Sequence, residues 1–186
     1  MTSVARPGAG WPVEATTGSP EETRALAAAL APLCRAGDVV LLVGDLGAGK
    51  TVFAQGFAGA LGVAGPVTSP TFALVRHYRC GPESPVRTLI HADVYRTGSV
   101  AEVTDLALAE LVEEDAVVVV EWGDMAAPAL GESALEVTLV VSDATANPDA
   151  RSVAVAGRGR WSERAGEVAA VLEPVAGATQ GESRGR

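Results

Sequence analysis

The chain has 186 residues, of which 48% are hydrophobic and 20% are charged, a profile that suits one globular domain and excludes a largely disordered chain. Its formal net charge of -9 disfavours direct binding to a phosphate backbone, so we expect any link to nucleic acid to run through a partner. The two cysteines, Cys34 and Cys80, have no metal-like spacing, which argues against a zinc site or a disulfide framework.

Hydropathy argues against a membrane protein. We find no signal peptide and no apolar run near the roughly 20 residues that a membrane span requires. The longest nearly apolar runs are VVLLVG and AVVVVE. We therefore expect a cytoplasmic protein without a membrane partner.

Both ends of the chain have the composition of flexible tails. Residues 1–12 and 173–186 are rich in Pro, Gly and other small residues. No internal repeat or long linker interrupts residues 13–172, so we expect one domain there.

The first predicted elements are a strand over Val13–Thr17 and a helix. Ser19 is the expected N-cap of this helix, Pro20 occupies its first position, and Glu22 completes a capping box. The helix continues through TRALAAALAPLCR, where the proline weakens its last turn, and ends at Gly37.

A buried strand over 38–43 (DVVLLV) comes next, since this run is short, apolar and β-branched. The sequence GDLGAGKT, residues 44–51, follows at once, and a helix is predicted from Lys50 to about Leu61. Strand, glycine-rich loop and helix in this order are the context of a phosphate-binding loop. The pattern indicates that the chain binds a nucleoside triphosphate with Mg²⁺.

The remaining predicted elements are five short strands and two helices. Further strands are predicted at 72–79, 86–92, 116–120, 135–141 and 152–156, and helices at 99–111 and 161–172. Alternation in the first two thirds predicts an α/β fold with a central, mostly parallel sheet flanked by helices. The strand-rich last third predicts antiparallel additions to that sheet.

Glycines, a cation and a hydroxyl give the loop its expected chemistry. Gly44, Gly47 and Gly49 allow the backbone to bend around a phosphate with its N–H groups inward. Lys50 is the only lysine among 14 basic residues and should reach the β- and γ-phosphates, helped by the positive end of the helix dipole. The Thr51 hydroxyl should bind Mg²⁺.

Two acids follow buried strands and are candidates for the metal site. Glu121 follows VVVV, and Asp93 follows TLIHA. The carboxyl ends of strands in an open α/β sheet face the ligand crevice. Either acid is therefore a candidate to bind Mg²⁺, directly or through water, or to orient the attacking water. The alternative is a solvated acid at a strand end.

Hydroxyls and histidines near these acids allow two interpretations. Thr68, Ser69 and Thr71 in TSPTF suit a segment that senses a γ-phosphate, and a proline-fixed turn is an equal alternative. His77 and His91 are interpreted as strand-end residues with satisfied hydrogen bonds rather than as catalytic bases.

Two features bear on the base of the nucleotide. Trp122 follows the second acid and lies either near the nucleotide or in the core. The guanine-reading pattern Asn-Lys-x-Asp cannot occur, because the only lysine is in the loop and the only asparagine is Asn147. Adenine is therefore the expected base.

Four segments in series, GDLGAGKT, VTSPTFALVRHY, HADVYR and VVEWGD, resemble the TsaE (formerly YjeE) family, the ATPase component of bacterial tRNA threonylcarbamoyladenosine synthesis. The resemblance covers roughly residues 13–160. SPTF, H-x-D-x-Y-R and E-W in series are more specific than the phosphate loop alone. The resemblance implies a single-domain P-loop NTPase-like fold.

The resemblance also implies roles for matching residues. Lys50 and Thr51 match the phosphate and Mg²⁺ residues of the loop, Glu121 the metal-linked acid, and Asp93 an acid required for hydrolysis. We accordingly expect Lys50, Asp93 and Glu121 to be catalytic, and Thr51 and Glu121 to hold Mg²⁺. The residues expected to bind ATP are Gly44, Asp45, Leu46, Gly47, Ala48, Gly49, Lys50, Thr51, Val52, Thr71 and Trp122.

Partners are implied as well. TsaE-like proteins act with TsaD and TsaB, which place a threonylcarbamoyl group on adenosine at position 37 of tRNAs. The TsaE-like subunit hydrolyses ATP to support repeated cycles, with weak activity in the absence of its partners. It would meet tRNA only indirectly, which agrees with the acidic composition.

Two other classes of function use the same loop. A metabolite kinase would carry a second substrate pocket, often under an Arg-rich lid, and the sequence shows no Arg cluster over a helical lid. Turnover with small acceptors, rather than with TsaD and TsaB, would favour the kinase. A nucleotide-gated binding module would need ATP to dock but not hydrolysis, and an Asp93→Ala variant that still supports repeated modification would favour it.

Overall fold

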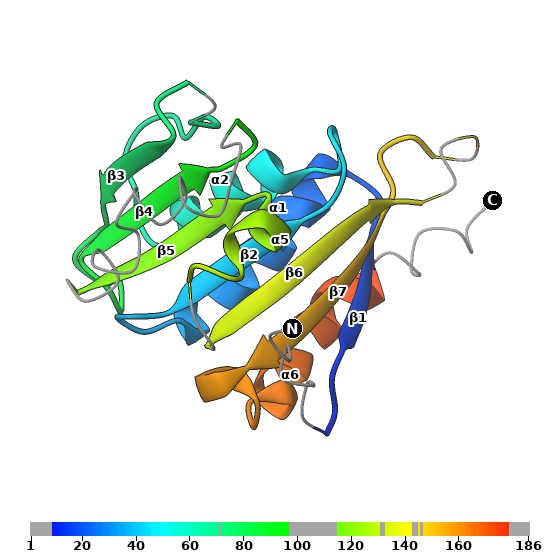
Figure 1. Ribbon diagram of the computed structural model, residues 1–186. Coiled ribbons are helices and arrows are strands. Elements are labelled where there is room, and N and C mark those ends of the chain that lie inside the picture. Colours follow the sequence, from blue (N-terminus) through cyan, green and yellow to red (C-terminus); the bar gives the residue numbers. More distant parts are fainter. Residues whose placement is uncertain are drawn as a thin grey trace.

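The structure is a computed structural model that describes residues 9–70, 72–96, 115–130, 133–142, 145 and 147–178, and its centre is one seven-stranded sheet (Figure 1). The strands are β1 Val13–Thr17, β2 Val39–Val43, β3 Val75–Arg79, β4 Thr88–Asp93, β5 Ala116–Glu121, β6 Ala134–Val141 and β7 Arg151–Arg158. They lie in the order β1-β7-β6-β2-β5-β4-β3. The four central strands are parallel, and β7, β1 and β3 add antiparallel edges. The predicted α/β class with a mostly parallel sheet is confirmed.

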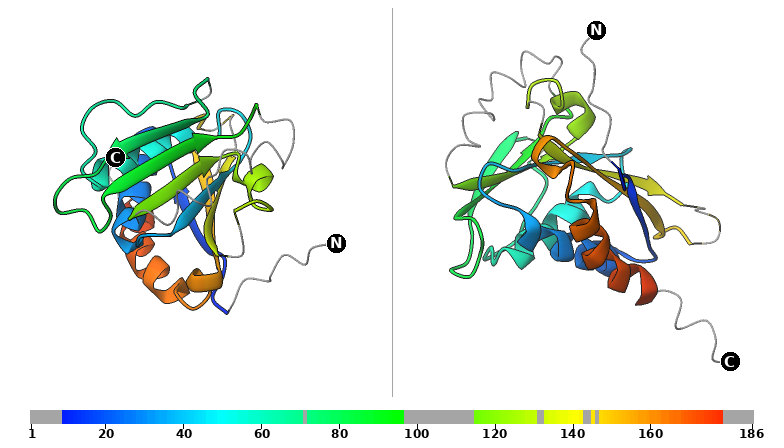
Figure 2. Two further views of the ribbon diagram at one scale, coloured as in Figure 1. Left: turned by 60° about the vertical axis from the view of Figure 1, so that its left-hand side comes forward. Right: turned by 90° about the horizontal axis from the view of Figure 1, so that it is seen from below.

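Helices cover both faces of this sheet in the described part of the chain. They are α1 Pro20–Leu30, α2 Lys50–Ala60, α5 Gly123–Ala126 and α6 Ala165–Ala178, with 3-10 turns η1 Ala31–Leu33 and η2 Gly159–Trp161. Figure 2 shows α1, α2 and α6 together on one face and the short α5 on the other. Strands β2 (VVLLV) and β5 (AVVVV before its final acid) are thereby enclosed between layers, which explains why they are apolar.

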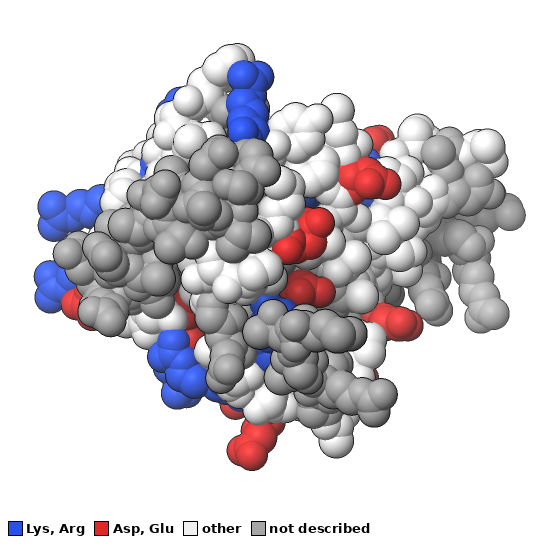
Figure 3. All heavy atoms as spheres, in the orientation of Figure 1, with Lys and Arg blue, Asp and Glu red and all other residues white. Residues whose placement is uncertain are grey.

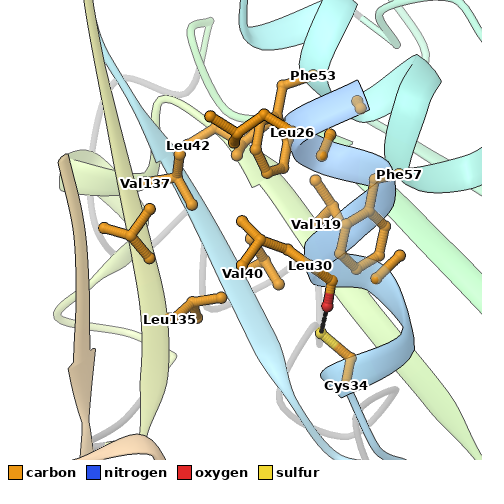
Figure 4. Close-up of a cluster of buried hydrophobic side chains, with 14 of the residues drawn as sticks. Leu26, Leu30, Cys34, Val40, Leu42, Phe53, Phe57, Val119, Leu135 and Val137 are labelled. Atoms are coloured by element: carbon orange, nitrogen blue, oxygen red, sulfur yellow. Dashed lines mark hydrogen bonds between the residues drawn. The ribbon is translucent and has the colours of Figure 1, made fainter. Parts of the chain in front are cut away.

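Strand β2 shows how the sequence supplies both layers. Val40 and Leu42 belong to the cluster beneath α1 and α2, whereas Val39 and Leu41 belong to the cluster on the α5 side. Successive side chains of a strand point to opposite faces, so a continuous apolar run fills two cores. In Figure 4, leucines of α1 and phenylalanines of α2 pack against aliphatic side chains of β2, β5 and β6.

Helix α1 starts where predicted and ends earlier. The Ser19 hydroxyl accepts a hydrogen bond from Glu22 N at 3.2 Å, and the Glu22 carboxylate accepts one from Gly18 N at 2.7 Å. The α-helical part stops at Leu30 instead of continuing toward Gly37. The reason is the proline in η1, which has no N–H with which to extend the helical ladder.

Strand β3 begins three residues later than predicted. Leu74 has a φ of 62°, and its N–H donates to Pro70 O at 2.6 Å. This left-handed residue ends a turn and is incompatible with an extended strand. The helix predicted at 99–111 lies outside the described residues.

The two ends of the predicted domain carry additional structure. Trp11 packs against the core, and its Nε1–H donates to Ser162 O at 2.9 Å. The closing helix starts at Ala165 rather than at Trp161, which is buried within η2. Helix α6 then continues to Ala178, past the expected boundary at residue 172.

Charge is unevenly distributed over the surface. Figure 3 shows acidic side chains around the middle of one face and most of the visible basic side chains toward its β3–β4 side. The exposed arginines of that side are Arg76, Arg79, Arg87 and Arg96. Within the described residues, no helix has the length and apolar character that a membrane crossing requires.

Candidate active site

The GDLGAGKT loop joins the carboxyl end of β2 to the first turn of α2. Gly44, Gly47 and Gly49 have φ values of 146°, 81° and 107°, a region that residues with a Cβ rarely adopt. A Cβ on Gly44 would also overlap the Leu139 carbonyl oxygen of β6. The loop can therefore take this path only because glycine occupies these positions.

Lys50 lies at the first helical position with its side chain folded into the loop. Its Nζ donates to Gly44 O at 2.6 Å and to Asp45 O at 2.9 Å, and it lies 3.8 Å from the centroid of the Trp122 ring. Burial lowers the pKa of Lys50, and the nearby carboxylates, led by Glu121, oppose that shift. The only lysine of the chain thus lies between the loop and an acidic wall, formed by the carboxylates of Glu121 and Asp93.

Thr51 meets Glu121 directly, although 70 positions separate them in the sequence. The Thr51 hydroxyl lies 2.9 Å from Oε1 and 3.0 Å from Oε2 of Glu121. Glu121 ends the fully buried strand β5 and is itself buried. The structure therefore brings together the two residues that the sequence predicts as metal-binding.

Asp93 lies beside Glu121 because the two residues are register partners at the ends of β4 and β5. One oxygen of its carboxylate accepts a hydrogen bond from Ser69 Oγ at 2.7 Å, and the other accepts from Tyr95 N at 3.0 Å. Both bonds fix the orientation of a buried carboxylate. The SPTF segment thus contributes Ser69, whose hydroxyl orients one carboxylate of the acidic wall.

His91 lies near the end of β4, as interpreted from the sequence, and its ring contacts Glu121 from outside the cavity lining. It is fully buried, and its Nε2 lies 3.0 Å from Oε1 of Glu121. His91 and Asp93 are two residues apart on β4, so their side chains share one face with Glu121. The Nδ1 of His91 has no hydrogen-bond partner among the described residues, so its hydrogen bonding is only half satisfied there.

Trp122 takes a left-handed conformation, with φ 62° and ψ 45°, directly after β5. This turn brings its ring to the site, where the Tyr95 ring lies 4.6 Å away between centroids. Trp122 both lines the cavity and packs against the buried cluster on the α5 side, so each of its two interpretations describes part of its environment. Together these side chains enclose a cavity of about 390 Å³ lined by Leu46, Gly47, Gly49, Lys50, Thr51, Val52, Ser69, Asp93, Tyr95, Glu121 and Trp122.

Other predicted residues lie elsewhere. Thr71 is outside the described residues, and Thr68 is exposed to solvent. His77 lies on the edge strand β3 and lines a different, larger cavity of about 840 Å³. That cavity lies at the amino ends of β4 and β5, away from the phosphate loop, and Asp115 is the only carboxylate among the described residues that line it. The smaller cavity holds the loop, the cation and the paired acids, so it is the candidate active site.

A glycine loop between a parallel strand and a helix, with a hydroxyl on the helix facing an acid on the neighbouring strand, defines a P-loop NTPase-like protein. A crystal structure of Bacillus subtilis YdiB has the same fold, with a TM-score of 0.69 and 31% identity over 86% of this chain and 94% of that one. The family model described as "Threonylcarbamoyl adenosine biosynthesis protein TsaE" matches residues 17–152. The chain belongs to the TsaE family.

Curated relatives agree with this assignment. The chain is 42% identical to the tRNA threonylcarbamoyladenosine biosynthesis protein TsaE of Streptomyces coelicolor, over 75% of this chain and 93% of the relative. It is 46% identical to the protein of that name from Mycobacterium tuberculosis H37Rv, over 64% and 73% of the two chains. The Bacillus subtilis relative is 42% identical, over 66% and 74%.

Proposed function

We propose that this chain binds ATP with Mg²⁺ in the candidate active site and hydrolyses it in the cytoplasm as a subunit of the tRNA threonylcarbamoyladenosine machinery. In this proposal TsaD and TsaB homologues stimulate a weak intrinsic ATPase, and hydrolysis supports repeated modification of adenosine at position 37. Support comes from family membership, the names of the relatives and the geometry of the site.

The observation that carries the proposal is the contact between the Thr51 hydroxyl and the Glu121 carboxylate. Both groups are hard oxygen donors, which suit Mg²⁺. Among the described residues, no group of three or more His, Cys, Asp or Glu side chains is arranged to hold a metal ion by itself, and Mg²⁺ typically takes one or two protein ligands with phosphates and waters. The donor set therefore fits a metal that arrives with a nucleotide.

Each side chain of the site has a part in the proposed reaction. The loop N–H groups and Lys50 hold the phosphates, and Lys50 turns from the Gly44 and Asp45 carbonyls to reach them. Thr51 and Glu121 hold Mg²⁺, which when bound neutralises charge that develops on the phosphates. Asp93, oriented by Ser69, positions the attacking water.

The rim of the cavity supports a role for protein partners. Leu46 and Tyr95 line the cavity and are 83% and 52% exposed, and Phe72, in the SPTF segment that also supplies Ser69 to the cavity, is 88% exposed. Arg96 lies over the Phe72 ring, 4.5 Å from its centroid. Large apolar side chains that stay exposed together around a site are typical of protein interaction surfaces.

Steady-state ATP hydrolysis with and without purified TsaD and TsaB from the same source tests the proposal. We expect slow turnover by the chain alone and strong stimulation by the pair. A matched reaction with GTP checks the expected preference for adenine. A folded, ATP-binding chain that ignores TsaD and TsaB and instead phosphorylates small acceptors would replace this proposal with a kinase.

A further inference from the structure

Arg151, the first residue of β7, contacts the phosphate loop from its outer side. Its Nε donates to Ala48 O at 2.9 Å, and one terminal nitrogen donates to Gly47 O at 3.2 Å. The other terminal nitrogen donates to Pro148 O at 2.8 Å and to Ala150 O at 2.9 Å. One guanidinium thus ties two loop carbonyls to the turn between β6 and β7.

The backbone of Arg151 is fixed by strand pairing on both sides. Arg151 is the register partner of Thr17 in β1 and of Val141 in β6. Next to it, the Ser142 and Ser152 hydroxyls lie 3.0 Å apart. The guanidinium therefore projects toward the loop from a strand that is paired on both sides.

Peptide geometry turns these contacts into a statement about phosphate binding. In a trans peptide the C=O and the following N–H point in opposite directions. The bond that holds Ala48 O outward therefore fixes the Gly49 N–H on the inner side of the loop, and the bond to Gly47 O braces the neighbouring peptide, whose Ala48 N–H donates to Asp45 O at 3.1 Å. Glycine populates several backbone conformations, so the φ values of 81° at Gly47 and 107° at Gly49 need such outside support.

The charge of Arg151 adds to this effect. A guanidinium is a cation with a planar set of N–H donors, and here two of these donors reach two adjacent carbonyls. A cation bonded to the C=O end of a peptide polarises the peptide, which makes its N–H end a stronger donor. Both effects prepare the loop for an anion before the anion arrives.

We propose that Arg151 is a positioning residue for phosphate binding, acting through the Gly47 and Ala48 peptides without touching the nucleotide. The inference rests on the proposed ATP binding by the loop. Nucleotide affinity would then depend on a residue of β7, which the sequence motif of the loop does not include.

The test compares Arg151→Ala, Arg151→Lys and Arg160→Ala with the unchanged chain. Arg160 is the matched control, because its side chain also donates to a backbone carbonyl, that of Gly37, far from the loop. ATP and ADP affinities are measured by calorimetry, and folding is checked by thermal unfolding. We expect Arg151→Ala to bind both nucleotides about tenfold more weakly, and Arg151→Lys, which keeps the charge and one donor, to be intermediate.

Chemical rescue separates positioning from general support of the fold. Millimolar guanidinium, far below denaturing concentrations, should restore part of the ATP affinity of Arg151→Ala and leave Arg160→Ala at its starting affinity. Unchanged ATP affinity in both Arg151 variants would overturn the inference, as would weak binding that follows only from a lowered unfolding temperature. If the unchanged chain fails to bind ATP, the proposed function itself is wrong.

Discussion

The two walls of the candidate active site differ in how the chain builds them. The phosphate-loop wall is one continuous stretch, residues 44–51, between β2 and α2. The acidic wall consists of Asp93 from β4 and Glu121 from β5, with His91 of β4 hydrogen-bonded to Glu121. The hydrogen bond between Thr51 and Glu121 joins the two walls.

This difference determines what each wall depends on. The loop wall depends on local backbone conformation, above all on glycines with positive φ. The acidic wall depends on the pairing of β4 with β5, in which Asp93 and Glu121 are partners. A slip of one residue in that pairing would turn a carboxylate to the opposite face of the sheet. Loop variants should therefore affect binding first, and acid variants should affect hydrolysis first.

Removing the cation of the loop wall should have the largest effect. We expect Lys50→Ala to weaken ATP binding about 100-fold or more, because charge-assisted bonds to phosphates are lost. Calorimetric titration with ATP measures this loss. Lys50→Arg serves as a control that keeps the charge but not the compact shape, and it should also bind poorly. Unchanged ATP binding by Lys50→Ala would refute the loop assignment.

Removing the charge of the acidic wall should separate hydrolysis from binding. We expect Glu121→Gln to lower partner-stimulated hydrolysis about 100-fold, since Mg²⁺ loses its charged ligand, and to change ATP affinity without Mg²⁺ by less than about threefold. Glu136→Gln on β6 is a control that removes an equal charge outside the cavity. Equal hydrolysis rates in Glu121→Gln and the unchanged chain would move the metal role to Asp93.

Substitution of His91, which contacts Glu121 of the acidic wall, should have a smaller effect on hydrolysis. We expect His91→Leu to raise the Mg²⁺ concentration for half-maximal hydrolysis about tenfold, because Glu121 loses the neighbour that orients it. His91→Gln retains an N–H donor and should stay close to the unchanged chain. A Mg²⁺ titration of ATPase activity measures both. If the two variants shift the midpoint equally, packing rather than the bond to Glu121 matters at this position.

Sequence reasoning located the loop wall because all its information is contiguous. Strand, glycines, lysine and threonine occur in one stretch, and each has a local physical reason. The two acids could also be predicted, since strand ends in an α/β sheet face the ligand crevice. Their partners could not. The contact of His91 with Glu121 follows from the β4–β5 register, which the sequence does not state.

Arg151 illustrates the same limit at longer range. It lies 103 positions from Ala48 in the sequence, and the two meet because β7 pairs with β6, which pairs with β2. The sequence predicted antiparallel strands in the last third of the chain. It did not predict which of these strands would place a side chain against the phosphate loop. The positive φ of Leu74 was also invisible, because leucine seldom adopts it.

The smallest expected effect concerns stability and the buried charge of Lys50. Its pKa is lowered from 10.5 in the folded protein, chiefly by burial. Between the lowered value and 10.5, the unfolded chain therefore binds more protons at this residue than the folded chain. The free energy of unfolding should therefore rise with pH across that window. At lower pH Lys50 is charged in both states, and the destabilisation of the folded state by burial of this charge is fully present.

Lys50→Met isolates the contribution of the Lys50 charge to the free energy of unfolding, because methionine keeps the approximate length of the side chain and removes the charge. The difference in unfolding free energy between the unchanged chain and Lys50→Met should shift in favour of the unchanged chain as pH rises toward 10.5. Urea unfolding of both proteins, followed by tryptophan fluorescence at several pH values, measures the difference, and titrations shared by the two proteins cancel. A difference that stays constant over the window would mean that Lys50 keeps its ordinary pKa. The acidic wall would then fully compensate the burial of the cation that faces it.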